Sequence, residues 1–289
     1  MRFSLIVREV CKPLILIFGI FIISLLPVFI TMNGFAWPGI NPFSDMLYAI
    51  FHPSTLTYMN STSGVERTVF PIIFTAFKSS IMVLSMALLF SFVVALVGAI
   101  IVYQLPKKVI NPIKLMLSCM QSIPDVVYVI FSYMCLIFSY RLTGRNFFNI
   151  NGAGEEEAIV VPSVVLAILP TIYFFQYMLE LIEEEEKTAY FEFAVSKGFK
   201  KYYILVKHVI RNMLVRLAHQ GKFLFGIMIT NLFIVEYLYG NFGLTSFLFA
   251  YREPSLFFVS ALLFFIPVYL FLKIIQLVIY LTTHQEVEV

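Results

Sequence analysis

The chain is poor in charged side chains, which make up 13% of its residues, whereas hydrophobic residues make up 60%. A soluble domain carries about twice that fraction of charge. A chain of 289 residues with so few charges could not cover a globular surface with polar groups. The shortage therefore argues against a soluble globular protein and indicates that much of the surface faces lipid.

Cysteine and metal-binding patterns are scarce as well. Cys11, Cys119 and Cys135 form no C-x-x-C pair, so we interpret them as small apolar residues within helices. The histidines form no H-E-x-x-H pattern, and no G-x-x-x-x-G-K-[ST] phosphate loop is present. We predict no catalytic residue, no cofactor site and no metal site. The net charge of only +3, without a basic face rich in aromatic residues, also gives no sign of nucleic-acid binding.

What the chain does have is long apolar runs. Each reaches or exceeds the roughly 20 residues that a helix needs to cross the hydrocarbon core of a bilayer. They lie at about 13–32, 70–103, 113–140, 159–182, 217–239 and 255–282. We therefore expect an all-α, polytopic membrane helix bundle of about six transmembrane helices.

The distribution of positive charge predicts the orientation. Of the 20 Lys and Arg residues, 15 fall in segments that are cytoplasmic if the N-terminus is inside, and 5 fall on the other side. An even number of spans then places both termini in the cytoplasm of a cell-membrane protein. Residues 1–69 would comprise the first transmembrane helix and an outer loop. Residues 70–285 would form the membrane core, and the acidic run from Glu155 to Glu157 in a second outer loop is expected to be solvated.

The largest cytoplasmic segment, about 183–216, has high helix propensity and is interrupted by Gly198. Glycine adopts positive φ at little cost, so it can reverse the chain between two short helices. Basic and aromatic residues follow it, in the sequence Lys200-Lys201-Tyr202-Tyr203. Such a surface is suited to a protein interface. The segment therefore predicts a rigid lever that receives force from a motor subunit.

Several short motifs of this segment occur together in a known family. The stretch Tyr190-Phe-Glu-Phe-Ala-Val-Ser-Lys-Gly198, followed by Lys207-His-Val-Ile-Arg-Asn212, resembles the cytoplasmic "EAA" loop of ABC importer permeases. More narrowly, it is similar to the dipeptide/oligopeptide/nickel branch. Ser122-Ile-Pro124, Leu169-Pro170, Val235-Glu236 with Phe242-Gly-Leu244, and Arg252-Glu-Pro254 follow that branch in the same order. The branch's "PGDP" element is replaced by Trp37-Pro-Gly-Ile-Asn-Pro42.

The resemblance implies an ABC importer type I permease fold without its own ATPase site. It implies a coupling helix around Val195 to Tyr202 that docks on a cytoplasmic ATPase, which would bind the ATP. The other implied partners are a second homologous permease subunit and an extracytoplasmic substrate-binding protein. The residues assigned to the ATPase-coupling loop are Tyr190, Glu192, Ala194, Val195, Lys197, Gly198, Phe199, Lys200, Tyr202, His208, Arg211 and Asn212.

Four polar residues in or beside the apolar runs are candidates for lining the pathway: Gln121, Asp125, Asn231 and Glu236. An ionisable residue within a span is expensive unless it faces a cavity or a partner. Asp125 could contact a substrate amine, or it could cap a helix beside Pro124, and the sequence favours neither. Glu236 is better explained by pairing with Arg252 near the outer surface.

Three functions remain open at this stage. The first is a permease subunit that forms half of a translocation pathway for peptides or a related small solute such as a nickel complex or metallophore. The second is the permease of an ABC exporter or immunity system for a toxic peptide. An intramembrane enzyme ranks far below both, because no nucleophile with a base and no ligand set converges in the sequence.

Overall fold

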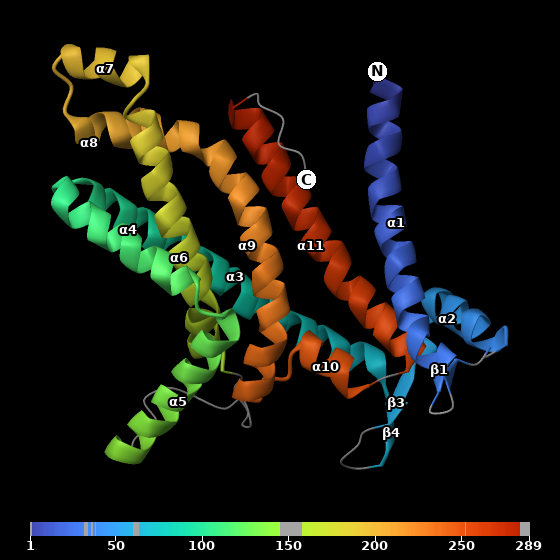
Figure 1. The fold of residues 1–289 in the computed structure, drawn as a ribbon. Helices are drawn as coiled ribbons and strands as arrows, with labels where there is room; N and C mark the ends of the chain where they lie inside the picture. Colours follow the sequence, from blue (N-terminus) through green and yellow to red (C-terminus); the bar gives the residue numbers. More distant parts are fainter. Residues whose placement is uncertain are drawn as a thin grey trace. The chain divides into compact units, whose positions relative to one another are not determined.

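A computed structural model of the chain describes residues 2–31, 34–35, 37, 39–59, 64–144, 158–251 and 253–283. Within these ranges the structure is predominantly helical, with two short antiparallel strand pairs (Figure 1). In chain order the elements are α1 (Arg2–Phe29), β1 (Ile30–Thr31), β2 (Gly34–Phe35), α2 (Asn41–Phe51), η1 (Pro53–Thr55), β3 (Thr57–Met59), β4 (Glu66–Thr68), α3 (Val69–Tyr103), α4 (Lys107–Gln121), α5 (Asp125–Thr143), α6 (Val160–Glu185), α7 (Ala189–Ser196), α8 (Lys201–Ile204), η2 (Leu205–Val209), α9 (Ile210–Tyr239), α10 (Leu244–Ala250) and α11 (Pro254–Thr283).

Among the described residues, six helical segments are long and apolar enough to cross a membrane, as the sequence predicts. They are Cys11–Phe29, Val69–Tyr103, Asp125–Thr143, Val160–Glu185, Lys201–Tyr239 and Pro254–Leu277. The all-α membrane fold is therefore confirmed.

One predicted span is divided in two. The apolar run at 113–140 was expected to form a single helix, but α4 ends at Gln121 and α5 begins at Asp125. Pro124 adopts extended backbone angles, with φ −55° and ψ 138°, and it cannot donate a backbone hydrogen bond to the preceding turn. Proline also disfavours the helical conformation of the residue before it, here Ile123. The chain therefore breaks at Ser122-Ile123-Pro124.

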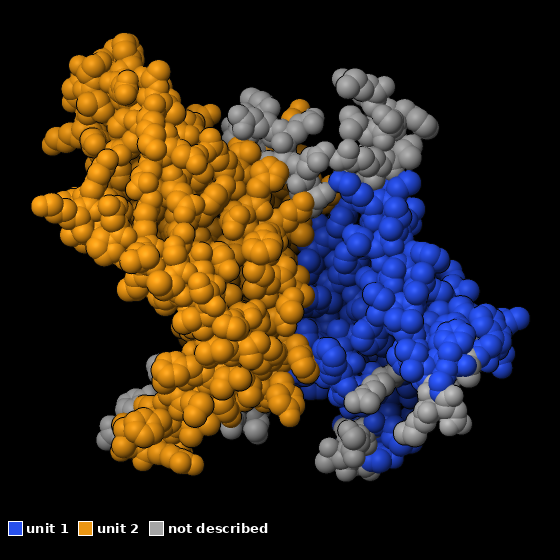
Figure 2. All heavy atoms as spheres, viewed as in Figure 1, with its two compact units in different colours: residues 1–80, 242–270 blue, residues 81–241, 271–289 orange. Residues whose placement is uncertain are grey.

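The chain groups into two compact units (Figure 2). Unit 1 comprises residues 1–80 and 242–270, and unit 2 comprises residues 81–241 and 271–289. This grouping does not test the expected division between residues 69 and 70, which stays a prediction.

In unit 1, the N-terminal helix packs against α2 and the first part of α11. Leu25, Met46 and Phe258 are buried together. The ring of Phe21 meets that of Phe258 edge to face at 5.5 Å between centroids. Such aromatic geometry stabilises packing beyond the area that it buries.

A second group of aromatic side chains in unit 1 joins the β3–β4 hairpin to α10. The ring of Tyr58 on β3 lies 5.7 Å from that of Phe247 on α10 and 4.6 Å from that of Tyr251. The backbone N–H of Leu244, at the start of α10, donates to the hydroxyl of Ser80 on α3 at 2.7 Å. These contacts fix the position of α10 within the unit.

In unit 2, a continuous apolar core is shared by α3, α4, α6 and α9 and extends to the two short helices beyond α6. Phe191 on α7 and Ile204 at the end of α8 are both buried in it. Gly98 on α3 lies so close to the ring of Phe175 on α6 that an added Cβ would lie 3.2 Å from it. This core places α7 and α8 at one end of the α6–α9 pair (Figure 1).

Candidate functional site

The end of α6 carries four consecutive glutamates, Glu183 to Glu186. Successive residues of an α-helix point about 100° apart, so four in a row point to different sides. Glu183 forms an ion pair with Lys114 of α4 at 2.7 Å, and Glu184 forms one with Arg216 of α9 at 2.5 Å. The acidic run therefore forms ion pairs that connect α6 to α4 and α9, and it is not simply a solvated stretch of charge.

Glu186 connects α6 to two further elements. Its carboxylate accepts a hydrogen bond from the hydroxyl of Tyr103 on α3 at 2.7 Å and one from Lys201 on α8 at 3.0 Å. Burial raises the pKa of Glu186, but the hydrogen bonds from Tyr103 and Lys201 and the positive charge of Lys201 outweigh it. The pKa of Glu186 therefore lies below its ordinary value, and the carboxylate is charged at neutral pH.

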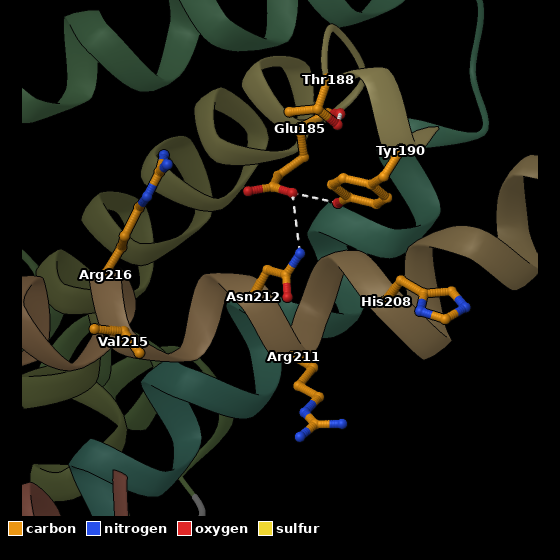
Figure 3. A pocket seen from close by; sticks show the side chains of 8 residues that line it. All are labelled: Glu185, Thr188, Tyr190, His208, Arg211, Asn212, Val215 and Arg216. Carbon is orange, nitrogen blue, oxygen red and sulfur yellow. Dashed lines mark hydrogen bonds between the residues drawn. The ribbon is translucent and has the colours of Figure 1, made fainter. Parts of the chain in front are cut away.

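Glu185 is the buried member of the run, with 7% of its surface exposed. Its carboxylate accepts hydrogen bonds from the hydroxyl of Tyr190 on α7 and from the side-chain amide of Asn212 on α9 at 3.4 Å (Figure 3). Burial, followed by the hydrogen bond and the negative charge of Glu185, raises the pKa of Tyr190 to about 12. Tyr190 is therefore a neutral donor at any physiological pH, and Glu185 joins three helices.

The backbone between α6 and α7 is a tight turn. The N–H and the hydroxyl of Thr188 both donate to the carbonyl of Glu185, at 3.1 and 2.6 Å. The same threonine precedes α7, and its own carbonyl accepts from the N–H of Phe191 at 3.1 Å. This turn brings Tyr190 on α7 back towards Glu185, the last residue of α6.

A glycine ends α7, as the sequence predicts. Gly198 has φ +85°, its N–H donates to the carbonyl of Val195 at 2.9 Å, and the N–H of Phe199 donates to Ala194 at 3.2 Å. This pair of bonds is the Schellman arrangement, in which a residue with positive φ closes a helix. No atom would lie within 4 Å of an added Cβ, so glycine is required by the backbone angle and not by crowding.

The predicted coupling helix around Val195 to Tyr202 is corrected in one respect. That range contains the end of α7, the Gly198 turn and the start of α8, so it is mostly a turn between two short helices. The positive φ of Gly198 cannot continue a right-handed helix. The two short helices joined at Gly198 are present, and the longer one, α7, precedes the glycine.

Large apolar side chains are exposed around this turn. Phe193, Phe199 and Tyr202 have exposed fractions of 59%, 48% and 54%. The ammonium group of Lys197 lies 4.3 Å from the centre of the Phe193 ring, and Phe199 stacks on Tyr203 at 5.4 Å between centroids. We call the exposed set Phe193, Val195, Phe199, Tyr202, Tyr203 and Val206 the lever face. An exposed apolar surface that includes basic residues is typical of a protein interaction site.

The remaining predicted loop residues are distributed around the same end of unit 2. Glu192 and Lys200 are exposed beside the lever face. His208 lies in η2, a single π-helical turn between α8 and α9. His208 lines a cleft of about 540 Å³ (Figure 3). The cleft is also lined by Glu185, Thr188, Tyr190, Arg211 and Asn212. Arg211 points away from Glu185 in this view.

Of the four pathway candidates, the structure brings two together. Asp125 is the first residue of α5, and its carboxylate accepts from the N–H of Val126 at 3.1 Å and from the side-chain amide of Asn231 on α9 at 2.5 Å. Asn231 and Glu236 are buried, while Gln121 is partly buried at the last position of α4.

For Asp125 the structure shows a packing function, whereas for Glu236 the predicted ion pair is not described. A carboxylate in the first turn of a helix is stabilised by the helix dipole, so Asp125 has a structural function whether or not it lines a pathway. Arg252, the predicted partner of Glu236, lies outside the described residues, as do Glu155 to Glu157. No group of three or more His, Cys, Asp or Glu side chains that could hold a metal occurs in the part of the chain that the structure describes.

Comparison with known families decides the class of protein. The family described as "Binding-protein-dependent transport system inner membrane component" matches residues 95–283, from the last third of α3 to the end of α11. The chain belongs to this family. It is therefore the permease subunit of an ABC transporter and a multi-pass inner-membrane protein. Membership implies association with an ABC ATPase and usually with a substrate-binding protein. A comparison with curated proteins finds no match to the chain.

The sequence did not point to two residues of this site. Glu185 and Thr188 were not among the predicted site residues, although their hydrogen bonds join the end of α6 to α7 and, for Glu185, also to α9. A run of four glutamates predicts solvated charge unless cations and hydrogen-bond donors are known to surround it. The only signal was the spacing of Glu183 to Glu186 over one helical turn, which aims each carboxylate at a different neighbour.

Proposed function

We propose that this permease imports peptides or a related small solute, such as a nickel complex or metallophore. It forms half of the translocation pathway and couples to a cytoplasmic ATPase through α7, Gly198 and α8. ATP binds to the ATPase, and this chain supplies no nucleotide site of its own. Alternating access follows when closure of two ATPase domains moves the lever and, with it, the transmembrane helices.

The lever face is the single observation that carries the coupling proposal. Its apolar side chains are exposed on short helices that project beyond α6 and α9, and they lie inside the range that matches the family. Lys197, Lys200 and Lys201 add positive charge around them. A partner with an apolar groove and an acidic rim would cover this face.

The bias of positive charge supports the orientation. Eight of the 20 Lys and Arg residues lie in the segment from Lys187 to Lys222, which contains the lever. By the positive-inside rule this segment, together with both termini, is cytoplasmic. The β3–β4 hairpin and the loop that follows α5 are then extracytoplasmic, where a substrate-binding protein delivers its cargo.

The partner prediction is tested by purifying the complex from its native membranes through a tag on this chain. Mass spectrometry should find an ABC ATPase and either a second six-span permease or a second copy of this one. Replacement of both Phe199 and Tyr202 by serine should remove the ATPase and leave the chain in the membrane. An ATPase that is retained at the wild-type level by this variant would contradict docking through the lever face.

The direction and the cargo are tested with membrane vesicles of both orientations. Right-side-out vesicles, loaded with ATP and given a mixed library of di- to pentapeptides, should deplete part of the library as measured by mass spectrometry. Vesicles with the ATPase side outward should accumulate none of it. Accumulation in the second kind alone would overturn import in favour of export.

A further inference from the structure

Helix α7 is attached to the rest of unit 2 by few side chains. Of its eight residues, Phe191 alone is buried. Tyr190 and Ala194 pack against the same core, but apolar contacts are not directional and fix the orientation of α7 less strictly than hydrogen bonds to a charged group do. A lever that transmits force needs a second, directional attachment.

The structure assigns that attachment to Glu185. We propose that Glu185 is a positioning residue which, through Tyr190 and Asn212, fixes α7 to α6 and α9 so that the three move together during transport. We call these three residues the Glu185 latch. The inference deepens the proposed coupling function and rests on it.

The chemistry of the latch is suited to this task. Glu185 is 7% exposed, and the two donors to its carboxylate, Tyr190 on α7 and Asn212 on α9, belong to helices other than α6 (Figure 3). Hydrogen bonds to a buried charge are stronger than those between neutral groups, and they require a defined geometry. A displacement of α7 against α6 or α9 would leave the carboxylate with too few donors, so the latch resists it.

The neighbouring pair Glu184–Arg216 provides a matched control. It also joins α6 to α9, but its side chains are 62% and 48% exposed and neither belongs to α7. An exposed ion pair of this kind contributes little, because water and salt screen it. Substituting Glu184 removes the same charge, one residue away, without touching the latch.

The test measures how firmly α7 is held. Spin labels are attached at S196C on α7 and H219C on α9, both at exposed positions, after the three native cysteines have been replaced by serine. Electron-electron double resonance gives the distance between the labels in the purified complex, with and without ADP-vanadate. The wild type should give one distance that is the same in both states.

In E185Q the amide oxygen can still accept at the position of Oε2, to which both donors point, but the negative charge is lost. We expect a second distance population of at least about a tenth of the signal, because replacing a charged acceptor by a neutral one weakens both hydrogen bonds and shifts such an equilibrium by roughly tenfold. E184Q should behave as the wild type does. A single unchanged distance in E185Q, or the same second population in E184Q, would overturn the assignment.

If E185Q does not assemble, Y190F decides the question, because it removes one hydroxyl and keeps the ring. A second population in Y190F supports the latch, and a wild-type distance contradicts it. Loss of assembly in both variants would assign Glu185 to folding alone and also contradict it. A complex that lacks any ATPase would instead refute the proposed coupling, while the label distances would still report on the latch.

Discussion

At the scale of single residues, the lever depends on one backbone angle. Gly198 has φ +85° with open space around the position of an absent Cβ. A side chain there meets no neighbour, so the cost of a substitution is the strain of positive φ, roughly 1–3 kcal/mol for a non-glycine residue. β-branched residues suffer most, and asparagine least.

This angle predicts different effects for two substitutions of similar size. G198V should abolish transport and weaken retention of the ATPase, while insertion into the membrane is unchanged. G198N should keep most of the activity, because asparagine tolerates the left-handed region. Both are checked by co-purification of the ATPase and by vesicle uptake. Wild-type transport in G198V would show that the turn does not couple.

Asp125 is the residue at which pathway and packing functions can be separated. D125N removes the negative charge and keeps one oxygen that can accept from the amide of Asn231, while an NH₂ group replaces the oxygen that accepts from the N–H of Val126. If Asp125 contacts a cationic group of the substrate, the variant should assemble normally and take up the substrate at least about tenfold less efficiently, the effect of one lost charged contact. Unchanged uptake kinetics in vesicles would assign Asp125 to packing.

At the scale of elements, α7, α8 and the turn between them carry large apolar side chains that are not buried within unit 2. Phe199 is 48% exposed there, and Phe51 on α2 is 76% exposed at a position outside the family match. F199S should reduce the amount of ATPase that co-purifies, because it removes apolar area that docking would bury. F51S should not. Equal loss of ATPase in the two variants would point to a general effect of exposed aromatic residues on assembly.

The Glu186 contacts make the attachment of α8 sensitive to acid. Because the pKa of Glu186 in the folded protein is below its ordinary value of 4.5, its contribution to stability is present above pH 4.5 and is lost as the pH falls below that value. In thermal unfolding of the detergent-purified chain, E186Q should therefore lose less stability between about pH 5 and pH 3 than the wild type does. Parallel losses in the two proteins would exclude Glu186 as the group concerned.

Hydrophobic length was enough to predict the long membrane helices, although not the short helices and strands between them. A run of roughly 20 or more apolar residues has few alternatives to a membrane helix. The predicted runs lie within a few residues of α6 and α11, and the run at 217–239 ends with α9, which begins seven residues earlier. The exception was the run at 113–140, where hydropathy continues through a proline that breaks the backbone. Hydropathy records composition and is insensitive to backbone geometry.

The candidate site was predictable only where local sequence determines it. Gly198 and the helices beside it follow from rules that act within a few residues. Asn212 and Asn231, the partners of Glu185 and Asp125 on α9, are 27 and 106 residues away from them, and only the packing of α6 and α5 against α9 brings these pairs together. No local pattern encodes such pairs, so the latch was missed and the contact between Asp125 and Asn231 was not foreseen.

At the scale of the whole molecule, the main prediction concerns which side of the membrane each part occupies. A cysteine at Ser196 on α7 should react with a membrane-impermeant maleimide only from the cytoplasmic side, and one at Thr68 on β4 only from the outside. The native cysteines are first replaced by serine, because all three are exposed. Labelling of both positions from the same side would refute the orientation.

The four glutamates at the end of α6 also restrict how long that helix can be. Each residue added before Glu183 would turn the whole run by about 100° and aim every carboxylate at the wrong neighbour at once. Seven added residues make nearly two full turns and would leave the run only about 20° out of phase, though shifted along the axis. Homologous chains that keep these contacts should therefore vary in the composition of α6 while the number of residues between Pro170 and Glu183 stays constant.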